Sequence, residues 1–210
     1  MNVDIKICGL TNLEDAEAAL SAGADFLGFV LYSKSPRGIT PAKLKEILAG
    51  LSRPCRAVAV VVNESRAAVE ALATECRLHA VQIHGDEPAA EFAHCACRLW
   101  RAVRVGGCAI MPNPADWPTA ERYVVDAAAP GLYGGTGSVA DWTGAAALAA
   151  RNVVMLAGGL TPENVGAAIE AVHPTGVDVA SGVESAPGRK DHAKLRRFIE
   201  AARQAARARA

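Results

Sequence analysis

The amino-acid sequence predicts an α/β fold in which a parallel sheet closes into a single (β/α)₈ barrel over residues 1–210. Eight apolar, β-rich runs alternate with helical segments along the chain, which is the pattern of repeated strand–helix units. Several of these runs are almost continuously apolar, as expected for parallel strands that are covered on both faces. The 210 residues suffice for one well-buried core and no linker divides them, so we expect one domain.

The first strand–helix unit has clear local signals. Residues 3–7 form a β-rich run, and Thr11 with Glu14 three residues later forms a capping box for a helix of about ten residues. Leucine and alanine recur at helical spacing in that helix. Gly23 is placed to end the helix, because glycine readily adopts the left-handed conformation of a helix C-terminus.

The same unit repeats along the rest of the chain. Further strands are expected at residues 26–31, 57–62, 80–83, 99–103 and 123–125, and at runs that begin at 153 and 177. Further helices are expected at residues 41–51, 64–74, 88–96, 139–150 and 191–208, whereas residues 106–118 contain helix breakers and give a weak signal. A doubly wound open sheet is the alternative. Its dinucleotide-binding form is disfavoured because no Gly-x-Gly-x-x-Gly turn follows the first strand.

Glycine-containing turns follow the last two strands. The first turn includes Gly158 and Gly159 and leads into a helix, for which Thr161 is the expected N-cap. The second turn includes Ser181 and Gly182. Glycines let backbone N–H groups approach a ligand, and a phosphate site commonly lies after strands 7 and 8 of such barrels. The two turns therefore predict a phosphate cradle, with two ordinary strand-to-helix turns as the alternative.

Composition and charge exclude several classes of protein. Lys plus Arg number 22 and Asp plus Glu number 22, so there is no overall attraction to nucleic acid or to a membrane surface. No signal-like segment occurs and no stretch is long enough to span a bilayer, so we expect a cytoplasmic protein. The six cysteines are then expected to be reduced thiols. Because Cys95-Ala96-Cys97 lacks the spacing of a zinc site, we expect no bound metal.

Polar side chains at the strand ends are the candidates for chemistry, because barrel active sites lie at that end of the strands. Cys8 follows the first strand, where a nearby helix start could lower its pKa, or it could serve only in packing. Arg37 could bind a carboxylate through two hydrogen bonds or lie in a solvated loop. His84 could bind a ligand or hold a loop. Asp126 follows an apolar strand and, if desolvated, could stay protonated and act as a general acid.

A glycine-rich loop follows Asp126 and contains Gly135, Thr136 and Gly137. Its backbone N–H groups and the Thr136 hydroxyl could complete the phosphate cradle. A flexible surface loop is the alternative, because glycine enrichment predicts that equally well.

Taken together, these motifs resemble the phosphoribosylanthranilate isomerase family, and the match covers nearly the whole chain. The matching motifs are Lys6-Ile7-Cys8-Gly9-Leu10-Thr11, Gly28-Phe29-Val30, Ser35-Pro36-Arg37, Val81-Gln82-Ile83-His84-Gly85, Gly134-Gly135-Thr136-Gly137, Asp141-Trp142, Leu156-Ala157-Gly158-Gly159-Leu160 and Asp178-Val179-Ala180-Ser181-Gly182-Val183-Glu184. The resemblance implies a (β/α)₈ barrel. It also implies the Amadori rearrangement of N-(5-phosphoribosyl)anthranilate in tryptophan biosynthesis.

The resemblance also implies roles for individual residues. Cys8 would be the general base, Asp126 the general acid, and Arg37 the group that holds the anthranilate carboxylate. One acid and one base suffice for this chemistry, so no cofactor is expected. Leu31 and Ala140 stand where the family often has Phe, and we expect local repacking there.

Two other readings of the sequence remain open. A different phosphosugar barrel enzyme, such as an epimerase or indole-glycerol-phosphate synthase, would share the cradle. The synthase would need a catalytic lysine inside the barrel, and the strand interiors offer few besides Lys6. A non-catalytic barrel that binds a phosphate ligand is the second alternative. The expected partner is a small-molecule phosphosugar substrate, and the chain is expected to be a monomer or a homodimer.

Overall fold

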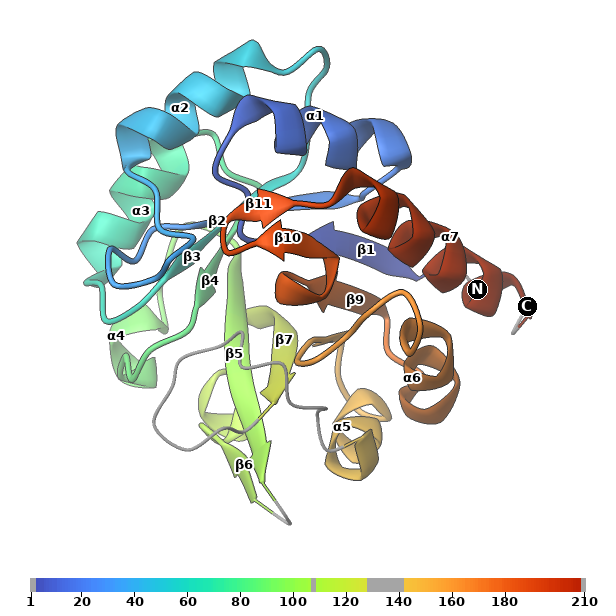
Figure 1. Cartoon of the computed structure of the whole chain (residues 1–210). Coiled ribbons are helices and arrows are strands. Elements are labelled where there is room, and N and C mark those ends of the chain that lie inside the picture. The colour runs from blue at the N-terminus through green and yellow to red at the C-terminus, as the bar shows by residue number, and fades with distance from the viewer. Residues whose placement is uncertain (1–2, 107–108, 128–141, 209–210) are drawn as a thin grey trace.

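The computed structural model describes residues 3–106, 109–127 and 142–208, without the side chains at positions 106, 109, 126 and 127. Eight parallel strands close into a barrel, because β4 pairs with both β3 and β5. In chain order the barrel strands are β1 (Asp4–Ile7), β2 (Phe26–Val30), β3 (Ala57–Val61), β4 (Ala80–Ile83), β5 (Leu99–Gly106), β7 (Ala120–Ala127), β8 (Val154–Leu156) and β9 (Gly176–Val179). The predicted (β/α)₈ fold is thereby confirmed (Figure 1).

The helices lie around the outside of the barrel (Figure 1). They are α1 (Leu13–Ala22), α2 (Pro41–Gly50), α3 (Arg66–Glu75), α4 (Ala89–Phe92), α5 (Trp142–Ala149), α6 (Val165–Val172) and α7 (His192–Ala208). The helix expected at 88–96 is wrong in length, since α4 has only four residues. Its N-cap residue, Pro88, makes no side-chain hydrogen bond to the helix start. Between β5 and β7, the described residues form a strand antiparallel to β5, β6 (Ala109–Met111), and the 3₁₀ helix η1 (Pro114–Asp116).

Two predicted helix starts differ from the structure in instructive ways. The N-cap of α1 is Asn12 rather than Thr11, because the Asn12 side chain accepts the Asp15 N–H at 2.8 Å while the Thr11 hydroxyl donates to Gly188 O. The helix after Gly159 is assigned only from Val165. Thr161 nevertheless caps the turn before it, since its hydroxyl accepts from Glu163 N and its carbonyl accepts from Val165 N.

The interior of the barrel is filled in layers that set the height of the candidate site. One buried cluster, separate from the core between sheet and helices, consists of Phe26, Val58, Ala80, Trp100, Val124, Met155 and Ala157. Side chains two residues apart in a strand share a face, so Gln82 and then His84 follow Ala80 towards the C-terminal end of β4. The apolar cluster therefore forms the base on which a more polar layer rests.

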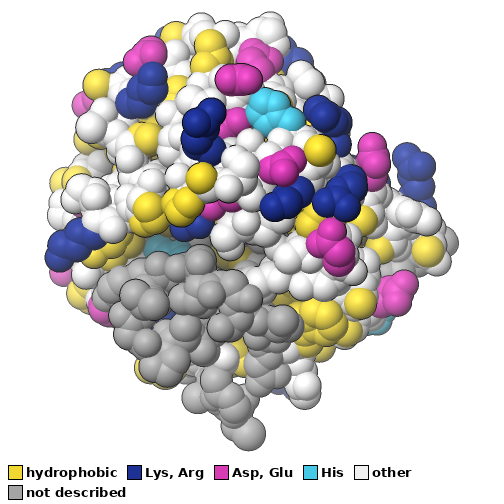
Figure 2. All heavy atoms as spheres, viewed as in Figure 1, with side chains coloured by type: hydrophobic (Ala, Val, Ile, Leu, Met, Phe, Trp, Pro, Cys, Tyr) yellow, Lys and Arg dark blue, Asp and Glu magenta, His cyan; other side chains and the backbone are white. Residues whose placement is uncertain are grey.

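The surface carries charges of both signs. Figure 2 shows acidic and basic side chains interspersed over the face in view. Within the part of the chain that the structure describes, no helix is both long enough and apolar enough to cross a membrane.

Candidate active site

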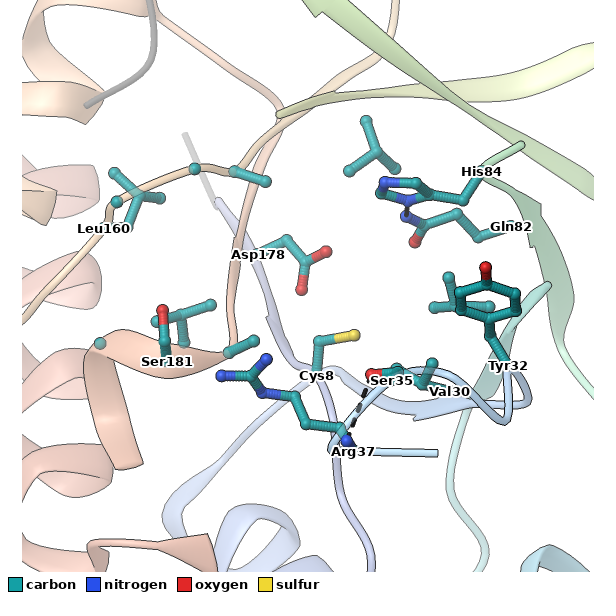
Figure 3. Close-up of a pocket in the computed structure, with 18 of the residues that line it drawn as sticks. Cys8, Val30, Tyr32, Ser35, Arg37, Gln82, His84, Leu160, Asp178 and Ser181 are labelled. Carbon is teal, nitrogen blue, oxygen red and sulfur yellow. Dashed lines mark hydrogen bonds between the residues drawn. The ribbon is translucent and has the colours of Figure 1, made fainter. Parts of the chain in front are cut away.

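A cavity lies at the C-terminal ends of the barrel strands, and most of the predicted site residues line it (Figure 3). The structure brings together Cys8, Arg37, His84, Gly158, Gly159, Ser181 and Gly182. Asp126 lies in β7, opposite Arg104 of β5, but its side chain is outside the description. Gly135, Thr136 and Gly137 lie outside the described residues altogether.

Cys8 is buried directly after β1, and its N–H donates to Val179 O at 2.8 Å. Burial raises the pKa of the thiol above its ordinary value, although the nearby Lys6 ammonium opposes the rise. The expected lowering by a helix start is therefore wrong. The physical reason for the higher pKa is desolvation, which penalises a buried thiolate. The helix that was expected to lower it, α1, begins only at Leu13.

Beneath Cys8, three polar side chains meet inside the barrel. The fully buried Lys6 ammonium lies 2.8 Å from Asp178 Oδ2, 2.7 Å from Gln82 Oε1 and 3.4 Å from Cys8 Sγ. Sheet register explains the first contact, because Lys6 on β1 and Asp178 on β9 are paired residues. The ion pair lets β1 and β9 carry charged side chains into the interior of the barrel.

Arg37 reaches the cavity from the loop after β2 and is held there by a second buried network. Its Nε and Nη2 donate to the two carboxylate oxygens of Glu184 at 2.8 and 2.7 Å. Glu184 starts the short strand β10 (Glu184–Ala186), which pairs with β11 (Arg189–Lys190). Gly9, at φ +74°, makes room for this arrangement, since a Cβ there would lie 2.5 Å from Arg37 Cδ.

The charge states in this network follow from its contacts. Lys190 Nζ lies 3.0 Å from Glu184 Oε1. Burial acts against the Glu184 carboxylate, but hydrogen bonds from Arg37 and attraction to Lys190 outweigh it and lower the pKa of Glu184. Burial lowers the pKa of Lys190 in spite of Glu184. The pKa of Arg37 is raised, chiefly by its hydrogen bonds to Glu184, so the guanidinium is firmly charged.

His84 contributes a neutral polar group to the cavity wall. Its Nδ1 lies 3.2 Å from Gln82 Nε2. Burial, followed by the positive charges of Lys6, Arg104 and Arg101, lowers the pKa of His84 to about 4. The imidazole is therefore neutral at physiological pH, where it can exchange hydrogen bonds with a ligand without adding charge.

The two glycine turns predicted from sequence lie side by side on the cavity wall. Gly158 and Gly159 adopt φ values of +80° and +66°, which glycine tolerates and other residues rarely adopt. Gly182 packs against this turn so closely that a Cβ there would overlap Leu160 O. Asn164 fixes the turn, because its Nδ2 donates to Gly159 O at 2.9 Å. Backbone thus faces the cavity where side chains would otherwise fill it.

Sequence reasoning missed the residues that support the site. Glu184, Lys190, Asp178 and Gln82 were not singled out, and Lys6 was noted only as an unusual interior lysine. One signal was available, since a charged residue within an apolar strand is costly unless it has a partner. The identity of that partner depends on strand register, which the sequence pattern alone does not specify.

Comparisons with known proteins agree with this geometry. The family model described as N-(5'phosphoribosyl)anthranilate (PRA) isomerase matches residues 5–201. The N-(5'-phosphoribosyl)anthranilate isomerase of Geobacter sulfurreducens is 47% identical over 201 residues, which are 96% of this chain and 98% of that protein.

Two solved structures extend the comparison. A monomeric form of the dimeric phosphoribosylanthranilate isomerase of Thermotoga maritima has a TM-score of 0.82 and 36% identity, covering 97% of this chain and 100% of that one. A phosphoribosylanthranilate isomerase in complex with reduced 1-(o-carboxyphenylamino)-1-deoxyribulose 5-phosphate has a TM-score of 0.80 and 36% identity, with the same coverage. With its barrel and its strand-end cavity, this chain belongs to the N-(5'-phosphoribosyl)anthranilate isomerase family.

Proposed function

We propose that this chain catalyses the Amadori rearrangement of N-(5-phosphoribosyl)anthranilate to 1-(2-carboxyphenylamino)-1-deoxyribulose 5-phosphate, a step of tryptophan biosynthesis. The observation that carries the proposal is that one and the same cavity is lined by a buried thiol, an arginine and two glycine turns. These groups match a substrate with a proton to lose, a carboxylate at one end and a phosphate at the other. No cofactor is part of the proposal.

The reaction needs proton transfers at the furanose oxygen, at C2 and at C1. A general acid protonates the furanose oxygen, the ring opens, and the nitrogen lone pair forms a Schiff base to C1. A general base then removes the proton from C2, and the resulting enolamine becomes the C2 ketone as C1 gains a proton. We assign the base to Cys8, which lies at the bottom of the cavity.

We assign the acid to Asp126. Position 126 is two residues after Val124, which lines the cavity, and positions two apart in a strand lie on the same face of the sheet. A carboxylic acid at this place must keep its proton near neutral pH, which burial favours.

Arg37 is suited to hold the anthranilate carboxylate. A guanidinium has five N–H donors, and Glu184 uses only the edge formed by Nε and Nη2. Within the described part of the chain no hydrogen bond is recorded for the terminal edge, formed by Nη1 and the second Nη2 proton, and we assign this edge to a second carboxylate. Glu184 would then orient Arg37 as the substrate binds.

Arg37→Lys is therefore expected to lower kcat/KM. The loss should correspond to roughly 1–3 kcal/mol of transition-state binding, because an ammonium cannot serve two carboxylates with paired hydrogen bonds. Steady-state kinetics measure the loss. Arg197→Lys is the matched control, since Arg197 is exposed and its ion pair, with Glu163 at 3.4 Å, lies on the surface. Equal kinetics for both variants would show that Arg37 does not clamp the substrate.

The glycine turns are proposed to bind the phosphate. Gly182→Ala should weaken binding of inorganic phosphate by about tenfold or more, because the added Cβ would push the Ser181–Gly182 turn away from Leu160. Calorimetry measures the affinity, and a phosphate-soaked crystal locates the anion. Gly166→Ala in α6 is the control, since its Cβ would meet nothing closer than 3.9 Å. Unchanged affinity in Gly182→Ala, or an anion bound elsewhere, would contradict the cradle.

The overall function is tested by following the fluorescence of N-(5-phosphoribosyl)anthranilate as it disappears in the presence of the purified protein. Enzyme-dependent disappearance is the expected result. A protein that binds phosphosugars but leaves the signal unchanged would be a non-catalytic binding barrel.

The proposal also includes a cytoplasmic location and either a monomer or a homodimer, the Thermotoga maritima relative being described as dimeric.

A further inference from the structure

Cys8 has one direct side-chain neighbour that the proposed mechanism does not use. Lys6 Nζ lies 3.4 Å from Cys8 Sγ, within hydrogen-bond range for sulfur. Lys6 is completely buried and is not among the described residues that line the cavity, so it is placed to contact the base rather than the substrate.

The Lys6 ammonium is fixed in position by its other contacts. Asp178 Oδ2 at 2.8 Å and Gln82 Oε1 at 2.7 Å accept two of its three protons, which leaves the third for the sulfur. Gly28 makes room for the pair, since a Cβ there would lie 2.8 Å from Lys6 Cε and 2.9 Å from Cys8 Sγ. Contacts from Asp178 on β9 and Gln82 on β4, with the space left by Gly28, thus direct one N–H of the ammonium at the Cys8 thiol.

We propose that Lys6 is a positioning residue for the general base: its ammonium donates the hydrogen bond that stabilises the Cys8 thiolate and orients the sulfur lone pair, while Asp178 and Gln82 hold the ammonium in place. This role rests on the proposed function, in which Cys8 removes the C2 proton. It supplies the stabilisation that a helix start does not provide, because α1 begins too far from the sulfur.

The charges around Cys8 support this role. Burial disfavours charge on Lys6, but Asp178 and then Cys8 outweigh it, so the pKa of Lys6 is raised and the amine is charged at neutral pH. Among the described residues, the charged groups that act on Cys8 are Lys6 from β1, Asp178 from β9, Lys190 from β11 and Arg37 from the loop after β2. Of these four groups, Lys6 is the one that donates a hydrogen bond to the sulfur.

The test compares Lys6→Met with the parent enzyme, because methionine keeps a long chain and removes the ammonium. The pH dependence of Cys8 alkylation by iodoacetamide, corrected with Cys8→Ser, reports the thiolate without catalysis. We expect the titration to move up by at least about one pH unit, which means tenfold less thiolate at neutral pH. The rising limb of the plot of kcat/KM against pH should move to higher pH by the same amount, and KM should stay almost unchanged.

Two further variants make the outcome decisive. Lys6→Met leaves the Asp178 carboxylate unpaired, so Lys6→Met/Asp178→Asn is the variant to measure if the single one does not fold. Its titration should also lie above that of the parent, but by less, because Asp178 itself raises the pKa of Cys8. Lys45→Met is the control, since Lys45 is exposed and pairs with Glu75 on the surface.

The possible results separate the two proposals. An active parent with an unchanged Cys8 titration in both Lys6 variants overturns the role of Lys6 and leaves the isomerase function intact. A lower melting temperature and higher KM with an unmoved pH limb would likewise mean a purely structural lysine. A parent that does not convert the substrate overturns the proposed function, and the role of Lys6 with it.

Discussion

Asp126→Asn should reduce the single-turnover rate of N-(5-phosphoribosyl)anthranilate conversion by a factor on the order of 10²–10⁴, the usual contribution of general acid catalysis. The amide keeps the shape of the carboxylic acid but cannot deliver a proton to the furanose oxygen, so the ring stays closed. Product affinity should stay close to that of the parent, because the product no longer needs that proton. Rapid mixing measures the rate, and calorimetry with product measures the affinity.

The control for Asp126→Asn is Asp116→Asn, which makes the same change at an exposed position in η1. Its rate should equal that of the parent. If Asp126→Asn stays within about tenfold of the parent, equivalent to about 1.4 kcal/mol of barrier, another group protonates the substrate.

Cys8→Ser is expected to abolish the C2 deprotonation, with a loss also on the order of 10²–10⁴ or more. A serine hydroxyl is far too weak an acid to supply an anionic base at neutral pH, whereas a thiol is a much stronger acid than a hydroxyl. The substitution is nearly isosteric, so product binding should persist. Single-turnover rates on the open-chain species and product affinity measure the two effects separately.

The pH profile of the parent follows from the same residue. Burial raises the pKa of Cys8, with Lys6 opposing, and the base works only when deprotonated. The rate should therefore rise with pH through the neutral range, and Cys8→Ser should lose this dependence. Cys76→Ser controls for loss of buried sulfur, since Cys76 is buried at the end of α3, away from the cavity. A Cys8→Ser enzyme with near-parental rates would remove Cys8 from the mechanism.

The barrel could be predicted from sequence because its strands carry local signals. Residues 80–83 were predicted with the bounds that β4 has, since three of these four residues are apolar and His84-Gly85 follow them. The helix expected at 41–51 begins at the predicted residue and ends one residue earlier, as α2 (Pro41–Gly50). The length of α4 was overestimated because residues 89–96 include alanines with high helical propensity, and propensity alone is a weak guide.

The site was predictable only in part. Strand ends and glycine turns identify Cys8, His84 and the two glycine turns that line the cavity, because a parallel barrel brings all strand ends to one face. The Arg37–Glu184 contact spans 147 positions and depends on how a short hairpin folds back over the barrel. The pKa of Cys8 was predicted in the wrong direction for a related reason, since desolvation depends on tertiary burial.

The most direct test of the isomerase assignment follows carbon 2 of the sugar by NMR, using N-(5-phosphoribosyl)anthranilate labelled with ¹³C at that position. With the parent enzyme, the alcohol carbon signal should be replaced by a ketone carbon signal, with no release of anthranilate. With Cys8→Ser and Asp126→Asn, the alcohol signal should persist apart from spontaneous decay. A parent enzyme that leaves carbon 2 unchanged, or that only releases anthranilate, would contradict the proposed Amadori rearrangement.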